Sequence, residues 1–205
     1  SKANQIASND VLTFINADII LPKNFLNYVL MVNEKFRRYL MVGYRWDMDV
    51  DYYINFNKNN DEKRFWLETK SKSKKHSSSG IDYFSFNKNL FTNLPDFAIG
   101  RPGYDNWLLW KTRRRLIPII DASNQIKAIH QNHHYNFHNL KGDPKIKLEE
   151  DGQNNKKIIG ENLLTLLDAN YKIFDDKIVK KKDINFVNRN LGKLPIIFPE
   201  FSYLL

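Results

Sequence analysis

The sequence of 205 residues contains no cysteine. Disulfide frameworks and thiolate metal sites are therefore excluded. A chain without thiols suits a reducing compartment, and we expect a cytoplasmic protein. A length of this order fits one domain that buries most of its apolar surface without covalent cross-links. Long apolar runs are missing as well. No stretch approaches the roughly 20 apolar residues that cross a bilayer, so no transmembrane segment is predicted.

Acidic residues are outnumbered, because 23 Asp and Glu face 32 Lys and Arg, which gives a net charge of +9. Such a balance raises the hypothesis of a nucleic-acid or anionic-membrane partner. The charge is not spread evenly, because ten of the 32 basic residues lie in three short runs, at residues 70–75, 113–115 and 180–182. We interpret these runs as solvated surface, and binding to a phosphate-rich ligand or an anionic surface is the alternative.

A basic nucleic-acid-binding module is a further alternative. It needs aromatic residues exposed among the lysines and arginines. Many aromatic residues here fall in apolar strand and helix positions instead. We therefore expect no nucleic acid partner.

The pattern of apolar residues predicts an α/β fold. Short apolar or aromatic runs predict strands at residues 11–15, 40–43, 81–86, 117–120 and 126–129. Helices are predicted at residues 22–39, 104–116 and 154–167. In the first helix, Phe25, Val29, Val32 and Phe36 recur at three- and four-residue spacing. Strands that alternate with helices imply a layered α/β sheet.

The segment of residues 55–80 is polar and irregular, which predicts a loop or lid. Within it, residues 66–80 are rich in lysine and serine and are predicted to be a flexible loop. We assign residues 1–205 to a single domain, in which residues 172–205 form a C-terminal extension.

Asn16 and Asp18 follow the predicted strand at residues 11–15. Open α/β sheets place their ligands at this carboxyl end. The Asp18 carboxylate offers oxygen ligands to Mg²⁺ or Mn²⁺, which proteins hold with one or two carboxylates plus substrate phosphates. The Asn16 amide points to the same side and suits hydroxyl recognition. Alternatively, the two residues form a turn and cap the helix that begins near Pro22.

Four of the five histidines lie within nine residues, namely His130, His133, His134 and His138. Imidazole is a common ligand of Mn²⁺ and similar ions, and it titrates near neutrality. The spacing matches no structural zinc site. We favour a metal or phosphate role for at least one of them, and the alternative is a polar loop with hydrogen-bonded histidines.

Residues 100–107 read Gly-Arg-Pro-Gly-Tyr-Asp-Asn-Trp. Two glycines and a proline predict a tight turn, after which Asp105 begins a helix. Asp105 is either the N-cap of that helix, a role worth about 1 kcal/mol, or a general base towards a sugar hydroxyl. The segment by itself leaves both interpretations open.

These segments occur in a specific order. Phe-Ile-Asn-Ala-Asp-Ile-Ile-Leu at residues 14–21 is followed by Met-Val-Gly-Tyr-Arg-Trp-Asp at residues 41–47 and by Gly-Ile-Asp-Tyr-Phe-Ser-Phe at residues 80–86. Phe-Ala-Ile-Gly-Arg-Pro-Gly-Tyr-Asp-Asn-Trp-Leu-Leu at residues 97–109 and Ile-His-Gln-Asn-His-His-Tyr at residues 129–135 come next. The series resembles a group of GT-A-fold glycosyltransferases found in microbes and large viruses, over about residues 10–171.

The resemblance implies a GT-A-like layered sheet flanked by helices. It also implies metal-dependent transfer of a sugar from a nucleoside-diphosphate sugar to the hydroxyl of a glycan or other acceptor. Asn16-Ala-Asp18 would occupy the position of the family's Asp-x-Asp motif, with Asp18 on a divalent cation (Mn²⁺ or Mg²⁺) and Asn16 on ribose or the donor sugar. His133 or His130 would complete the metal shell.

Asp105 lies where such enzymes carry the residue that deprotonates the acceptor, which would give inversion at the anomeric carbon. Arg45, Asp82 and Arg101 are further candidates for contacts to the donor's sugar or phosphates.

The chain departs from the family at its beginning. A GT-A domain starts with a strand-helix-strand portion that binds the nucleotide, whereas about ten residues precede the metal strand here. We therefore expect a domain truncated at its N-terminus, which is a fragment or is completed by another chain or segment. The main alternative function is a non-catalytic carbohydrate- or nucleotide-binding remnant.

Overall fold

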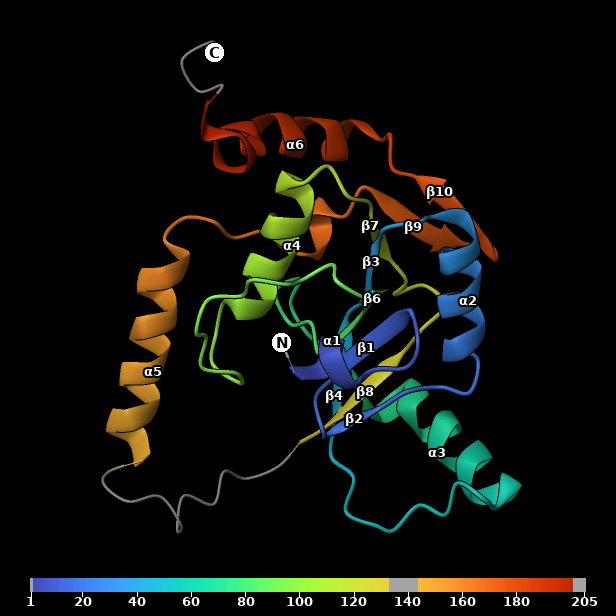
Figure 1. Ribbon diagram of the computed structural model, residues 1–205. Helices are drawn as coiled ribbons and strands as arrows, with labels where there is room; N and C mark the ends of the chain where they lie inside the picture. The colour runs from blue at the N-terminus through green and yellow to red at the C-terminus, as the bar shows by residue number, and fades with distance from the viewer. Residues whose placement is uncertain (1, 133–143, 201–205) are drawn as a thin grey trace.

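A six-stranded mixed sheet forms the centre of the computed structural model, which describes residues 2–132 and 144–200 (Figure 1). In spatial order its strands are β1 (Val11–Ile15), β6 (Tyr83–Asn87), β3 (Leu40–Val42), β7 (Ile119–Asp121), β9 (Tyr171–Phe174) and β10 (Lys177–Lys180). Strand β7 pairs in parallel with β3 and with β9, whereas β6 and β10 run antiparallel to their neighbours. Strand β1 therefore points the same way as β3, and its carboxyl end lies at the end of the sheet where ligands are usually bound.

Helices cover both faces of this sheet (Figure 1). In β3, Leu40 and Val42 face one core, which contains residues of α4 (Tyr104–Arg114), α5 (Pro144–Ile159) and α6 (Ile184–Ile197). Met41, between them, faces the opposite core, which contains Val29 and Val32 of α2 (Phe25–Lys35). The alternation follows from the two-residue period of a strand, and it explains why β3 is apolar throughout.

A smaller sheet lies beside the first and has the order β2 (Ile19–Ile20), β8 (Ala128–Gln131), β4 (Arg45–Met48) and β5 (Lys74–Lys75). Strands β4 and β8 are parallel, whereas β2 runs antiparallel to β8 and β5 runs antiparallel to β4. Helix α3 (Asn59–Lys72) packs on this sheet through Phe65, which contacts Met48 and Ile129 in a third core.

The five predicted strands are confirmed, and each begins and ends within two residues of its expected position. The strand at residues 11–15 is only half-buried, because it is an edge strand of the sheet. The helices predicted at residues 22–39 and 104–116 are also confirmed, although α2 is shorter at both ends. Helix α1 (Lys2–Ile6) was not predicted.

The loop predicted for residues 55–80 is wrong over residues 59–72, which form α3. The buried face of this helix consists of Glu62, Phe65 and Thr69, so two of its three positions are polar and the apolar period is hidden. The Glu62 carboxylate is paired with Lys23. Acidic residues in the first turn and lysines in the last turn match the helix dipole.

The helix predicted for residues 154–167 is wrong in its second half. Helix α5 ends at Ile159, and Gly160 follows with a φ of 57°, a left-handed conformation that ends helices. A short 3₁₀ helix, η1 (Leu166–Asp168), comes next. The described part of the predicted C-terminal extension contains most of β9, together with β10 and α6. Its two strands belong to the main sheet, so the segment is part of the domain. Within the described ranges, no helix combines the length and the apolarity needed to span a bilayer.

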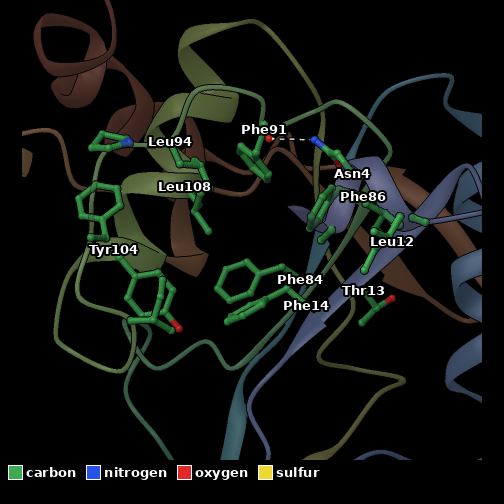
Figure 2. A pocket seen from close by; sticks show the side chains of 16 residues that line it. Asn4, Leu12, Thr13, Phe14, Phe84, Phe86, Phe91, Leu94, Tyr104 and Leu108 are labelled. Atoms are coloured by element: carbon green, nitrogen blue, oxygen red, sulfur yellow. Dashed lines mark hydrogen bonds between the residues drawn. The ribbon is translucent and has the colours of Figure 1, made fainter. Parts of the chain in front are cut away.

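An apolar cavity of about 500 Å³ lies on the α4 face of β1 and β6 (Figure 2). Its wall contains Leu12 and Phe14 of β1, Phe84 and Phe86 of β6, and Leu108 of α4.

A buried ion pair joins η1 to α6. The Asp168 side chain is 1% exposed, and it accepts hydrogen bonds from Arg189 Nε at 2.6 Å and Arg189 Nη2 at 2.9 Å. The same carboxylate accepts the backbone N–H of Thr165 at 2.8 Å. Two parallel bonds from a guanidinium to a carboxylate form a strong, well-oriented pair.

Replacing Arg189 by alanine should lower the free energy of unfolding by about 3 kcal/mol, because it removes the hydrogen-bonded counter-charge of the buried Asp168 carboxylate. Urea unfolding at neutral pH measures the change. Arg114→Ala is the matched control, since its partner Glu200 is exposed and solvent screens the pair. Equal effects of the two substitutions would contradict this role for Arg189.

Candidate functional site

A polar cleft with a volume of about 570 Å³ opens at the carboxyl end of β1. Every candidate residue in the described part of the chain lines it, namely Asn16, Asp18, Arg45, Asp82, Arg101, Asp105 and His130. His133, the other candidate metal ligand, lies outside the described residues, as do His134 and His138. Segments that are far apart in the sequence therefore meet in one cleft.

Asn16 and Asp82 are held together by the pairing of β1 with β6. The backbone N–H of Asn16 donates to the Asp82 carbonyl at 3.1 Å, which continues the ladder by one residue. The Asn16 side-chain amide donates to Asp82 Oδ1 at 2.7 Å, and Arg45 Nη1 donates to Asp82 Oδ2 at 3.0 Å. Asn16 therefore anchors a carboxylate of the cleft and does not cap helix α2, whose N-cap is Asn24.

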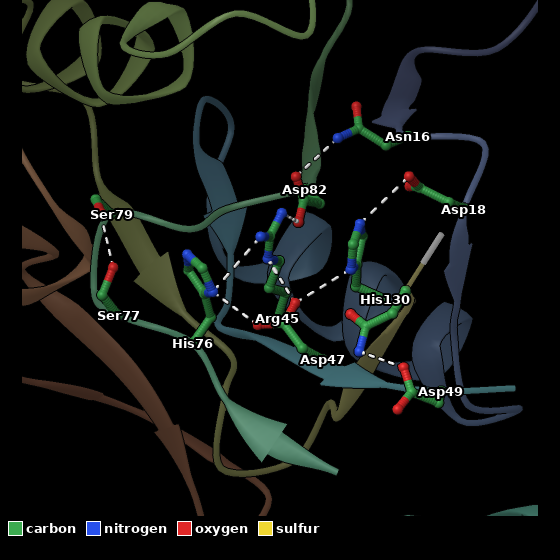
Figure 3. Close-up of polar contacts among 11 residues, drawn as sticks. Asn16, Asp18, Arg45, Asp47, Asp49, His76, Ser77, Ser79, Asp82 and His130 are labelled. Carbon is green, nitrogen blue, oxygen red and sulfur yellow. Dashed lines mark hydrogen bonds and ion pairs between the residues drawn. The ribbon is translucent and has the colours of Figure 1, made fainter. Parts of the chain in front are cut away.

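The Asp47 carboxylate lies within ion-pair distance of three side chains that line the cleft, those of Arg45, His76 and His130 (Figure 3). Its Oδ1 lies 3.0 Å from Arg45 Nε and 3.1 Å from His130 Nδ1. Its Oδ2 lies 2.7 Å from His76 Nδ1. Strand pairing explains the cluster, since Asp47 is opposite His130 in the β4–β8 ladder and the His76 backbone N–H donates to the Arg45 carbonyl.

His130 lies between two carboxylates. Its Nε2 is 3.3 Å from Asp18 Oδ2, whereas its Nδ1 faces Asp47. A carboxylate beside one ring nitrogen orients the imidazole and fixes its tautomer, and this arrangement is common for metal-binding histidines. Asp18 Oδ2 and His130 Nε2 are close enough to bind one divalent cation of the kind that accepts both carboxylate and imidazole ligands, such as Mn²⁺.

The described residues do not provide a complete metal site. Within residues 2–132 and 144–200, no group of three or more His, Asp or Glu side chains is placed to hold a metal ion. A cation bound by Asp18 and His130 thus depends on further ligands, which substrate phosphates typically supply to Mg²⁺.

The turn before α4 carries Arg101 into the cleft, and the first turn of α4 carries Asp105. Gly100 and Gly103 have φ angles of 79° and 99°, as the predicted tight turn requires. A Cβ added to Gly103 would lie 2.7 Å from Ile159 Cδ1, so the turn is also close to α5. Gly103 is the N-cap of α4, which corrects the alternative interpretation of Asp105 as its N-cap.

The Arg101 guanidinium belongs to the wall of the cleft. Its Nη1 donates to the neighbouring Gly100 carbonyl at 3.0 Å, whereas its buried Nε has no hydrogen-bond partner in the described structure. Leaving a buried N–H without a partner costs free energy.

Burial raises the pKa of the Asp105 carboxyl from 3.8 to about 6. The hydrogen bond from the Asn106 backbone N–H, at 2.9 Å, opposes this shift, and the negative charge of Asp82 adds to it. Burial also raises the pKa of the adjacent Tyr104 hydroxyl, and the charges of Asp105, Asp82 and Asp18 contribute. A carboxyl with a pKa near neutrality, in a cleft, suits proton transfer.

Sequence reasoning missed two members of the cluster, Asp47 and His76. Asp47 is two residues from Arg45, so the period of a strand places both side chains on one face. That signal was present in the sequence. The position of His76 could not be inferred, because it depends on the pairing of the two-residue strand β5 with β4.

Comparisons with family models, with curated proteins and with solved structures found no match to this chain.

The Asp105 carboxyl should titrate with a midpoint near pH 6, which ¹³C NMR of labelled aspartate measures directly. Because its folded pKa lies above the unfolded value of 3.8, the folded state holds the proton to higher pH. As the pH rises from about 4 to about 6, the free energy of unfolding of the wild-type protein should therefore fall relative to that of Asp105→Asn, in which this position does not titrate. A midpoint near pH 4 and parallel stability curves would contradict the assignment.

Proposed function

We propose that the protein is a metal-dependent glycosyltransferase that moves a sugar from a nucleoside-diphosphate sugar to an acceptor hydroxyl with inversion. The main support is one cleft that combines three chemical functions. The Asp18–His130 pair is placed to bind a divalent cation, Arg101 adds a positive charge to the wall, and Asp105 is a carboxyl with a pKa near neutrality.

The charges of the cleft support a need for metal. Asp18, Asp82 and Asp105 all line it, and they would repel the diphosphate of a donor. Arg45 offsets the Asp82 charge, since its Nη1 lies 3.0 Å from Asp82 Oδ2. A divalent cation beside Asp18 would offset more of this repulsion, and when bound it would also stabilise the negative charge that develops on the leaving diphosphate.

Asp105 is the proposed general base. Above about pH 6 its carboxylate is ionised and accepts the proton of the acceptor hydroxyl. The acceptor oxygen then forms a bond to the anomeric carbon, while the bond from that carbon to the β-phosphate oxygen breaks. The nucleoside diphosphate leaves with the electron pair. Attack opposite the leaving group inverts the anomeric centre.

The remaining candidates divide between binding and support. Arg101 is the proposed contact to the donor's phosphates, since a guanidinium matches phosphate geometry. Asp82 and Asn16 are proposed to contact hydroxyls of the donor sugar or ribose. Arg45 already lies beside Asp82 and Asp47, so we assign it mainly to holding these carboxylates in place.

The outer edge of β1 is the proposed place where the expected nucleotide-binding half attaches. Strand β1 is at the end of the main sheet, and within the described residues no strand pairs with its outer edge. Unpaired edges readily add further strands. We propose that another chain or segment pairs there and adds further contacts to the nucleotide, so the chain alone still binds the donor, but more weakly.

Asp18→Ala should abolish metal-dependent donor binding, because it removes the carboxylate proposed to hold the cation. Isothermal titration with Mn²⁺ and a panel of nucleoside-diphosphate sugars measures the effect. Asp10→Ala is the matched control, since Asp10 is exposed and lies outside the cleft. Binding that persists unchanged in Asp18→Ala would exclude the assignment.

Asp105→Asn should lower the rate of sugar transfer by about 10²- to 10⁴-fold while leaving donor affinity unchanged, because the amide cannot accept the proton. The wild-type rate should rise with pH through about 6, where the Asp105 carboxyl ionises. Asp96→Asn, an exposed site outside the cleft, is the control.

A normal transfer rate in Asp105→Asn would remove Asp105 as the base. Metal-dependent donor binding without transfer by the wild-type protein would instead favour the non-catalytic carbohydrate- or nucleotide-binding function.

A further inference from the structure

The apolar cavity beside β1 has the features of a ligand site. Its volume of about 500 Å³ is within the range of small-molecule pockets. Aromatic rings from β1, β6, α4 and the segment between β6 and α4 contribute much of the wall, namely Phe14, Phe84, Phe86, Phe91, Phe97 and Tyr104 (Figure 2). Such a wall favours an apolar ligand.

Two polar side chains of the cavity wall, Asn4 and Thr13, are engaged with the protein itself. Asn4 Nδ2 donates to the Phe91 carbonyl at 3.3 Å. Thr13 Oγ1 donates to Ser85 Oγ at 3.3 Å. These groups offer little to ordered water or to a polar ligand, whereas a hydrocarbon chain would displace water at no cost in hydrogen bonds.

The cavity and the polar cleft have a common wall. Ile99 and Tyr104 line both. The Tyr104 ring packs edge-to-face on Phe14, with ring centroids 6.3 Å apart, and the next residue, Asp105, lines the cleft. A ligand that occupies both spaces is therefore amphipathic, with its polar end beside Asp105.

The mouth of the cavity is open to solvent and apolar. Ile6 is 84% exposed, Ile99 59% and Leu94 41%, and all three belong to the wall. Exposed apolar side chains that surround a cavity mark a binding site more often than isolated ones do.

We propose that this cavity binds the alkyl chain of an amphipathic acceptor whose hydroxyl lies in the cleft beside Asp105. The transfer of sugar to that hydroxyl rests on the proposed function, whereas binding of the chain does not. The acceptor of the enzyme is thus an alkyl or lipid-like alcohol or glycoside.

The chain-length dependence of affinity tests the proposal. The probes are n-alkyl-β-D-glucosides with four, six and eight carbons, used below their micelle concentrations in isothermal titration. Affinity should rise about fourfold for each added methylene, which is the gain from moving a CH₂ group out of water. Equal affinities for the three probes would overturn the proposal.

Two substitutions at the mouth locate the site. Ile6→Lys places a charge on the cavity wall, and Ala3→Trp fills the entrance from an exposed position on α1. Both should remove the chain-length dependence. Ile184→Lys is the matched control, because Ile184 is also an exposed helical isoleucine (68%) and lies outside the cavity. Unchanged dependence in Ile6→Lys and Ala3→Trp would exclude the cavity as the site.

Asp105→Asn separates this inference from the proposed function. This variant should retain the chain-length dependence of binding and lose transfer to the octyl glucoside. Chain-dependent binding without any transfer by the wild-type protein would reject the proposed function only. Transfer with a KM independent of chain length would reject the alkyl site only.

Discussion

The parallel pairing of β4 with β8 is the constraint on which the candidate site depends. It places Asp47 opposite His130, so one carboxylate lies within 3.1 Å of both Arg45 and His130. A slip of one residue would turn the Asp47 side chain to the other face and separate it from these partners. The register is supported by the small core of Met48, Phe65 and Ile129, which packs α3 against the strands. The geometry of the cleft thus relies on a helix that does not line it.

The turn at residues 99–105 gives the molecule two adjoining environments. Ile99 and Tyr104 belong to the apolar cavity and to the polar cleft at once. The left-handed conformation of Gly103 directs the chain from this turn into α4, so a side chain there would disturb both spaces together. Burial beside the apolar core also raises the pKa of Asp105. The acid-base property of the cleft is therefore a consequence of the packing next to it.

The strands could be predicted because buried strands leave short apolar runs in the sequence. Helix α3 could not, since polar Glu62 and Thr69 take two positions of its buried face and their stabilisation depends on tertiary partners. For the site, the chemistry of the residues and the resemblance to a family together selected residues that share one cleft. Their contacts were not predictable. The link from Asn16 to Asp82 and the place of His76 beside Asp47 depend on strand register, which no local pattern records.

The position of β1 at the edge of the sheet couples ligand binding to the opening of the strand. It carries Asn16 and Asp18 at its end, yet only one of its edges is paired in the described structure. Edge strands open more easily than central ones, since fewer contacts hold them. Any ligand that binds only the ordered strand must shift this local equilibrium towards closure. Occupancy of the cleft would then slow the hydrogen exchange of the β1 amides. A partner strand on the outer edge would also strengthen ligand binding, and the ligand would strengthen binding of the partner by the same free energy.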